Sequence, residues 1–194
     1  MQIISTHKFV FSIILVTLLT QLSACVPVIV GGMAAGGAMA TDRRTSGIYI
    51  EDEGIELKAE RAIQTEVGVK IHANITSFNR NVLITGEALD QATKSRAEAI
   101  VTKTANVKTV TNALQIGSPT TLSSWTNDAY LTSKVKAQFV TANKFPANYV
   151  KIVTENSTVY LMGIVTRAEA NMAAEIASQS DGVKNVVKVF EYLD

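Results

Sequence analysis

Residues able to perform covalent or metal chemistry are few in this chain. It has one cysteine, Cys25, and two histidines, of which only His72 lies outside the N-terminal leader described below. A catalytic triad or a zinc site needs several such groups together. The acidic pair Asp52 and Glu56 falls on a charged helical segment, which is typical of a solvated face. We therefore expect no enzyme, with no catalytic residues, no cofactor and no metal site.

Cys25 follows a segment with the features of an export signal. Residues 1–24 begin with a short polar stretch and continue with an apolar run at 9–19, shorter than the roughly 20 residues that a membrane-spanning helix needs. The run ends at Leu22-Ser23-Ala24-Cys25, which resembles the bacterial lipobox. That resemblance implies that Cys25 is lipidated and becomes the new N-terminus. An ordinary signal with an unrelated cysteine, or an uncleaved anchor, is the alternative.

The predicted lipid anchor indicates where the protein resides. A diacylglyceryl group and an N-acyl chain on Cys25 would hold the protein stably, since each buried CH₂ contributes about 0.8 kcal/mol. Val26 stands where an aspartate would resemble an inner-membrane retention signal. We therefore expect an outer-membrane lipoprotein that faces the periplasm. Residues 25–45 would form its lipidated N-terminus and a flexible tether.

One local pattern is written twice in the rest of the chain. Val82-Leu83-Ile84-Thr85-Gly86 and Val159-Tyr160-Leu161-Met162-Gly163 both alternate branched apolar residues at the period of a strand and stop at a glycine. Each is followed by an alanine-rich helical stretch and a Val-x-x-Val run. The offset is 163 − 86 = 77 residues at the glycine and 183 − 107 = 76 at the first valine. Such self-similarity predicts two small domains of one fold.

Each repeat predicts the order helix, strand, strand, helix, strand. The fold class is α+β, with two helices on one face of a three-stranded mixed sheet. We expect the first domain at 46–116, a linker at 117–123 and the second domain at 124–194. Asn127 or Asp128 is the expected N-cap of the second domain's first helix. Its core face is predicted at Leu131, Val135 and Phe139, which align with Ile55, Ala59 and Ile63 at an offset of 76.

Both repeats resemble the BON domain. The resemblance rests on Val82, Ile84, Gly86, Val107, Val110, Asn112 and Leu114 in the first repeat, and on Val159, Leu161, Gly163, Val183 and Val186 in the second. A lipobox followed by two such domains is similar to the family of dual BON-domain outer-membrane lipoproteins. This implies binding of anionic phospholipid through the second domain, enrichment at the division site and support of outer-membrane integrity under envelope stress. The alternative is a protein-interaction adaptor that docks on outer-membrane assembly machinery.

The two first helices differ in charge. Residues 51–66 hold six acidic and two basic residues, a net of −4, whereas residues 124–145 hold one acidic and three basic residues, a net of +2. Anionic headgroups would attract the second segment at about 1 kcal/mol per basic residue. The whole chain has a net charge of +1, and removal of Lys8 with the leader leaves zero. A neutral total does not favour a nucleic-acid partner.

These observations place a candidate lipid-binding surface on the first helix of the second domain. Trp125 and Tyr130 have rings that favour the water–lipid interface. Helical spacing brings Tyr130, Lys134 and Thr141 to one side. The full candidate set is Trp125, Tyr130, Lys134, Val135, Gln138, Val140 and Thr141. The competing interpretation is that the rings pack at the edge of the core and the lysines form an ordinary solvated face.

Overall fold

The computed structural model describes residues 42–118 and 122–194. The described residues all belong to one compact unit. The predicted leader, lipobox and most of the tether lie outside the described residues, as does the part of the predicted linker at 119–121.

The two repeats give two copies of one α+β arrangement, which confirms the predicted fold class. The first copy contains α3 (Ser46–Glu66), η2 (Gly68–Lys70), β1 (Ile71–Phe78), β2 (Asn81–Ala88), α4 (Gln91–Thr102), β3 (Thr109–Asn112) and β4 (Gln115–Ile116). The second contains α5 (Leu122–Ala142), η3 (Ala147–Tyr149), β5 (Val150–Glu155), β6 (Thr158–Val165), α6 (Arg167–Ser178) and β7 (Asn185–Tyr192). In each copy an antiparallel hairpin is extended by a strand parallel to its second strand.

The last strand of the first copy is interrupted, where the sequence suggested one continuous strand. β3 ends at Asn112, and β4 pairs with the far end of β2. The Asn112 side chain accepts a hydrogen bond from the Leu114 amide at 3.2 Å, in place of a ladder bond. Leu114 is fully buried in the core. Leu114 faces the core in spite of the break, as does Phe190, its equivalent 76 residues later in the unbroken β7.

Each copy has a core between its helices and its sheet. The predicted helix positions Ile55, Ala59 and Ile63 are buried in the first core, and Val135 and Phe139 are buried in the second. Alternate strand residues complete both cores, among them Val82 and Ile84 in β2 and Val159 and Leu161 in β6. The predicted core faces of both first helices are confirmed.

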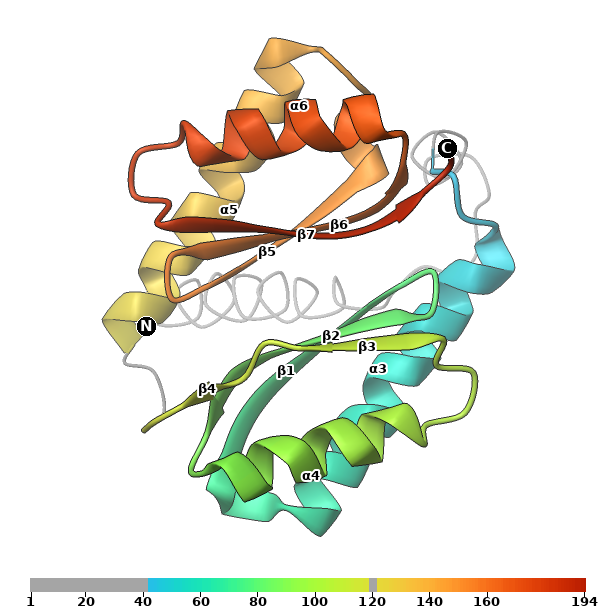
Figure 1. Cartoon of the computed structure of the whole chain (residues 1–194), viewed down its shortest axis with the longest axis vertical. Helices are drawn as coiled ribbons and strands as arrows, with labels where there is room; N and C mark the ends of the chain where they lie inside the picture. The colour runs from blue at the N-terminus through green and yellow to red at the C-terminus, as the bar shows by residue number, and fades with distance from the viewer. Residues whose placement is uncertain (1–41, 119–121) are drawn as a thin grey trace, which may run out of the picture. The chain divides into compact units, whose positions relative to one another are not determined.

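The faces of the two sheets that carry no helix pack against each other. Phe78 and Leu83 of the first copy form one buried cluster with Tyr160 and Met162 of the second. Figure 1 shows the two sheets in the middle, with α4 and α6 on opposite outer sides. β2 and β6 are therefore buried on both faces, which explains why Leu83 in β2 and Tyr160 and Met162 in β6, which lie between core positions, are also apolar.

An aspartate on the first helix of each copy binds the turn of the following hairpin. Both oxygens of Asp52 accept backbone N–H groups, from Asn79 at 2.8 Å and Arg80 at 2.7 Å. Asp128 accepts those of Asn156 and Ser157, each at 2.8 Å. All four turn residues have positive φ, as two-residue hairpin turns require.

The predicted N-cap role of Asn127 or Asp128 is therefore wrong. α5 begins at Leu122, so both residues lie inside the helix. Asp128 is buried because its carboxylate serves the turn between β5 and β6.

The strands do not stop at the repeated glycine, as the sequence suggested, but continue two residues further, to Ala88 and Val165, and neighbouring backbone requires the glycine in both. A Cβ on Gly86 would clash with the carbonyl oxygen of His72, and one on Gly163 would clash with that of Tyr149. Gly86 also has a φ of 109°, a conformation that side chains disfavour.

Candidate membrane-binding surface on the second domain

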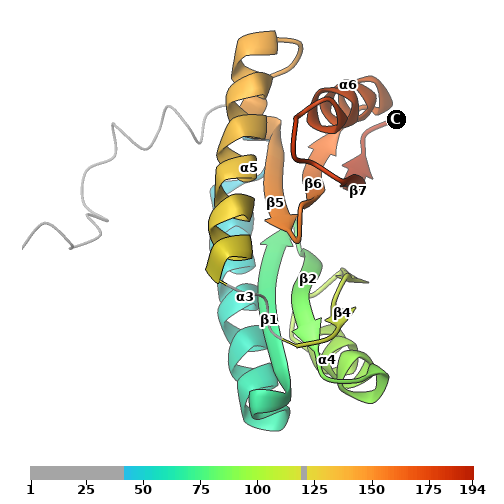
Figure 2. The same cartoon turned by 90° about the vertical axis from the view of Figure 1, so that its left-hand side faces the viewer.

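The outer side of α5 exposes three large side chains. Trp125 is 64% exposed, Tyr130 63% and Val140 63%. The opposite side of the helix carries Leu131, Val135 and Phe139, which are buried. The helix thus cannot turn these three exposed side chains inward without emptying its own core. In Figure 2, α5 and α3 lie along the same side of the two sheets.

The structure divides the predicted surface residues into two groups. Trp125, Tyr130, Val140 and Thr141 are exposed, and Lys134 is half-buried. Val135 is fully buried in the second core. Gln138 is half-buried and accepts a hydrogen bond from the Ser180 hydroxyl. Val135 and Gln138 therefore support the surface from beneath and do not form part of it.

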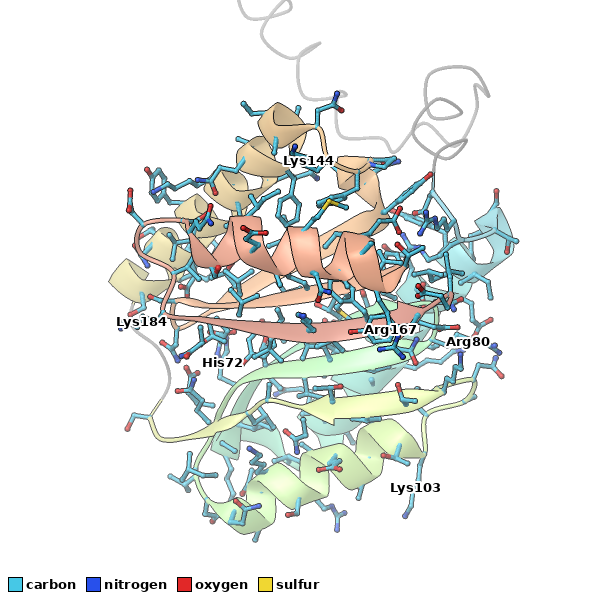
Figure 3. The ribbon with its side chains drawn as sticks, turned by 45° about the horizontal axis from the view of Figure 1, so that its top comes forward. His72, Arg80, Lys103, Lys144, Arg167 and Lys184 are labelled. Atoms are coloured by element: carbon cyan, nitrogen blue, oxygen red, sulfur yellow. The ribbon has the colours of Figure 1, made fainter. Side chains whose placement is uncertain are left out.

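Three lysines border the exposed side chains of α5. Lys134 donates to the carbonyl oxygen of Asp181 at 3.0 Å and lies 3.6 Å from its carboxylate, so part of its charge is balanced. Lys136 is exposed and forms no ion pair with any residue that the structure describes. Lys144 is exposed just beyond the end of α5 (Figure 3). The unbalanced positive charge therefore belongs to Lys136 and Lys144 more than to Lys134, which the sequence pattern favoured.

Burial removes the one acidic side chain of α5 from this surface. Asp128 is 5% exposed, and its two oxygens are both occupied by the hairpin turn. The acidic residues of α3 are also partly engaged: Glu56 pairs with Lys151 at 3.2 Å, and Glu66 pairs with Arg96 at 2.8 Å. Glu53 and Glu60 stay exposed on α3. The contrast between a basic α5 and an acidic α3 therefore persists at the surface.

A second group of acidic side chains lies where the two sheets meet. Glu87 and Glu155 are both buried. Burial raises the pKa of the Glu155 carboxyl; hydrogen bonds from Asn74 and Thr85 oppose the rise, and the charges of Glu87 and Asp128 add to it. Glu87 also lies 3.2 Å from the His72 ring, where the two side chains can form an ion pair when the histidine is protonated.

The one histidine within the described residues is His72 (Figure 3), which is about half exposed and whose ring lies 3.2 Å from the Glu87 carboxylate. Within residues 42–118 and 122–194 no group of three or more potential ligands could hold a metal ion. In the same part of the chain no helix is long and apolar enough to cross a bilayer.

Comparison with known proteins agrees with the repeated architecture. Residues 51–118 and residues 127–194 each match the BON domain. The chain belongs to the BON-domain family. The chain is 37% identical over 175 residues to the outer membrane lipoprotein DolP of Haemophilus influenzae. The match covers 89% of this chain and 91% of the relative. An outer-membrane lipoprotein facing the periplasm, as the sequence predicted, is thus confirmed.

Two further proteins are similar to this chain at lower sequence identity. The 21 kDa hemolysin of Actinobacillus pleuropneumoniae is 27% identical over 154 residues, covering 78% of this chain and 79% of the relative. The osmotically-inducible protein Y of Escherichia coli is 24% identical over 157 residues, covering 79% and 78%.

Proposed function

We propose that this lipoprotein binds anionic phospholipid through the outer side of α5 and so supports outer-membrane integrity, with a site of action at cell division. The observation that carries the proposal is the set of exposed Trp125, Tyr130 and Val140 beside exposed Lys136 and Lys144. Aromatic and aliphatic side chains favour the interface, and lysines favour anionic headgroups. We expect no enzymatic activity.

The anchor and the surface would act together. Lipidation at Cys25 is the proposed source of stable attachment, and α5 would add a reversible contact that depends on lipid composition. The folded parts are proposed to be the BON domains at 46–116 and 124–194, joined by the linker at 117–123. In this arrangement the first domain, whose α3 exposes Glu53 and Glu60, would be repelled by the same headgroups.

Vesicle flotation of the chain without residues 1–25 tests the proposal, because no lipid anchor then contributes. We expect binding to vesicles that contain phosphatidylglycerol, weaker binding as salt is raised, and none to neutral vesicles. Lys136→Gln should weaken the partition coefficient about fivefold, the equivalent of about 1 kcal/mol per lysine at the surface. Tyr130→Ser should weaken it further.

A matched control is available in the first domain. Lys58 occupies the position in α3 that Lys134 occupies in α5, since 134 − 58 = 76, and like Lys136 it is exposed. Lys58→Gln removes the same charge from the other copy, so binding should not change. Equal loss in Lys58→Gln and Lys136→Gln would mean that only net charge matters, and the assignment to α5 would be wrong.

An exposed aliphatic group favours the second candidate function, a protein-interaction adaptor that docks on outer-membrane assembly machinery. Val69 is 98% exposed, Leu89 61% and Ile116 52%. Their backbones are adjacent, since the Leu89 amide donates to the Lys70 carbonyl at 3.0 Å and Ile116 pairs with Ala88. Leu89→Ser should then abolish co-purification of an envelope protein while leaving vesicle binding unchanged. Co-purification unaffected by that change would count against this candidate.

A further inference from the structure

Two adjacent arginines at the start of the folded unit bind different domains. Arg43 forms a bidentate pair with Glu169 of α6, with both N–O distances at 2.8 Å. Arg44 pairs with Asp52 of α3 at 3.0 Å, and its guanidinium lies 3.9 Å from the centre of the Phe78 ring. The chain therefore meets the second domain first and the first domain one residue later. We call Arg43 and Arg44 the arginine clip.

The guanidinium of Arg43 is held by several contacts at once. In addition to Glu169, the guanidinium donates to the carbonyl oxygen of Ile164 at 2.9 Å and lies 3.9 Å from the centre of the Tyr149 ring. Bidentate pairing, a backbone acceptor and a ring face are the features that make arginine hard to replace by lysine. The hydrogen bonds from Arg43 hold the pKa of Glu169 below its ordinary value.

The residues that bind Arg43 and Arg44 lie close to the C-terminal half of α5. Tyr149 lies in η3, which follows the C-terminal end of α5. Arg44 lines one hollow together with Lys136 of α5 and Lys151 of β5. The chain that descends from Cys25 therefore joins the folded unit beside the C-terminal half of α5, although the first domain comes first in the sequence.

We propose that the arginine clip fixes this junction where the two domains meet, with Arg43 holding the chain to the second domain, so that the lipid anchor presents the outer side of α5 to the bilayer. Sixteen residues separate Cys25 from Asp42, since 41 − 25 = 16, and they reach at most about 55 Å. α5 has 21 residues and is about 30 Å long. The reach from the anchor to the junction is therefore longer than α5 itself. A junction at the C-terminal end of α5 lets the whole helix come close to the bilayer. This inference rests on the proposed lipidation of Cys25 and on the surface proposed for α5.

The first arm of the test measures the clip without any membrane. Trypsin cleavage after Arg43 is followed by mass spectrometry in the chain without residues 1–25. Glu169→Gln removes the charge but keeps an acceptor for the Thr166 amide, so α6 retains its N-terminal cap. Cleavage should become about tenfold faster, as expected for the loss of a charged hydrogen-bonded pair. Glu175→Gln makes the same change at an exposed position of α6 and should leave the rate unchanged. Equal rates in wild type and Glu169→Gln would overturn the proposal.

The second arm measures whether the lipid anchor brings α5 close to the bilayer. The lipidated full chain is reconstituted in neutral vesicles with brominated phosphatidylcholine, and quenching of Trp125, the one tryptophan, is recorded. Neutral lipid removes the attraction for lysines, so proximity depends on the anchor and the clip. Wild type should be quenched, and Glu169→Gln, which frees Arg43 while Arg44 still pairs with Asp52, should be quenched less. Undiminished quenching with faster trypsin cleavage would overturn the role of the clip in bringing α5 to the bilayer. Failure of the unlipidated chain to bind anionic vesicles would reject the proposed function instead. Both arms would still show whether the arginine clip holds the chain and keeps α5 close to the bilayer.

Discussion

Replacement of Asp128 by alanine should destabilise the second domain more than any change at an exposed carboxylate. The buried carboxylate accepts two backbone N–H groups of the β5–β6 turn, each at 2.8 Å. A hydrogen bond to a charged group contributes about 1.5–3 kcal/mol, and water can satisfy part of the freed turn. We therefore expect a loss of about 2–4 kcal/mol for Asp128→Ala. Asp128→Asn keeps one acceptor oxygen and should lose about half as much.

Urea unfolding followed by Trp125 fluorescence measures this loss. With an m-value of about 1–3 kcal/mol per molar, Asp128→Ala should lower the midpoint by roughly 1–2 M urea. Asp181→Ala is the control, because that side chain is fully exposed at 101% and should change stability by less than about 0.5 kcal/mol. If Asp128→Ala were as stable as the control, the hydrogen bonds from α5 to the hairpin turn would not contribute to folding, and our account of the buried aspartates would be refuted.

Three further perturbations test the packing of the two domains. Glu155→Gln should stabilise the protein at pH 7, because burial raises the folded-state pKa of Glu155. This gain in the free energy of unfolding should disappear as pH falls towards the ordinary glutamate pKa of about 4.3. A gain that does not depend on pH would contradict this explanation. Met162→Ala opens a cavity between the sheets and should cost about 2–5 kcal/mol in urea unfolding, whereas a cost near zero would mean that the sheets do not pack stably. Gly163→Ala should destabilise by about 1–3 kcal/mol, since its Cβ meets the Tyr149 carbonyl oxygen; a neutral result in calorimetry would argue against that close approach.

The repeat made most of the fold predictable. A strand with a glycine near its end, a helix and a second strand occur twice at nearly constant spacing, and this predicted the order of elements in both copies. The core faces followed from helical spacing, because Ile55 and Leu131 occupy equivalent positions. Local periodicity reports which side of an element is apolar, so these predictions needed no knowledge of tertiary contacts.

The packing of the two sheets could not be predicted from that periodicity alone. A signal was present, because Leu83, Tyr160 and Met162 are apolar residues on the second face of their strands. Strands buried on both faces read as continuous apolar runs, whereas the repeat was interpreted through its alternating positions only. The sequence also could not show what covers that second face, since the partner lies about 77 residues away.

The roles of several charged residues depended on tertiary contacts in the same way. Asp128 has the residue type of an N-cap, and only the position of the hairpin turn shows its different role. Arg43 stands in a polar stretch before α3, but its partner Glu169 is 126 residues away. Within the candidate surface, Trp125 and Tyr130 are exposed, as residues that contact lipid must be. Lipid binding itself stays a prediction.

Quenching of Trp125 by brominated phosphatidylglycerol tests the central claim most directly. The chain without residues 1–25 is bound to anionic vesicles, and its one tryptophan reports on the outer side of α5. We predict strong quenching that decreases with salt, together with free access of a carboxyl-labelling reagent to Glu53 and Glu60 on α3. Vesicle-bound protein with unquenched Trp125 and protected Glu53 and Glu60 would show that another surface meets the membrane, and the account would be wrong.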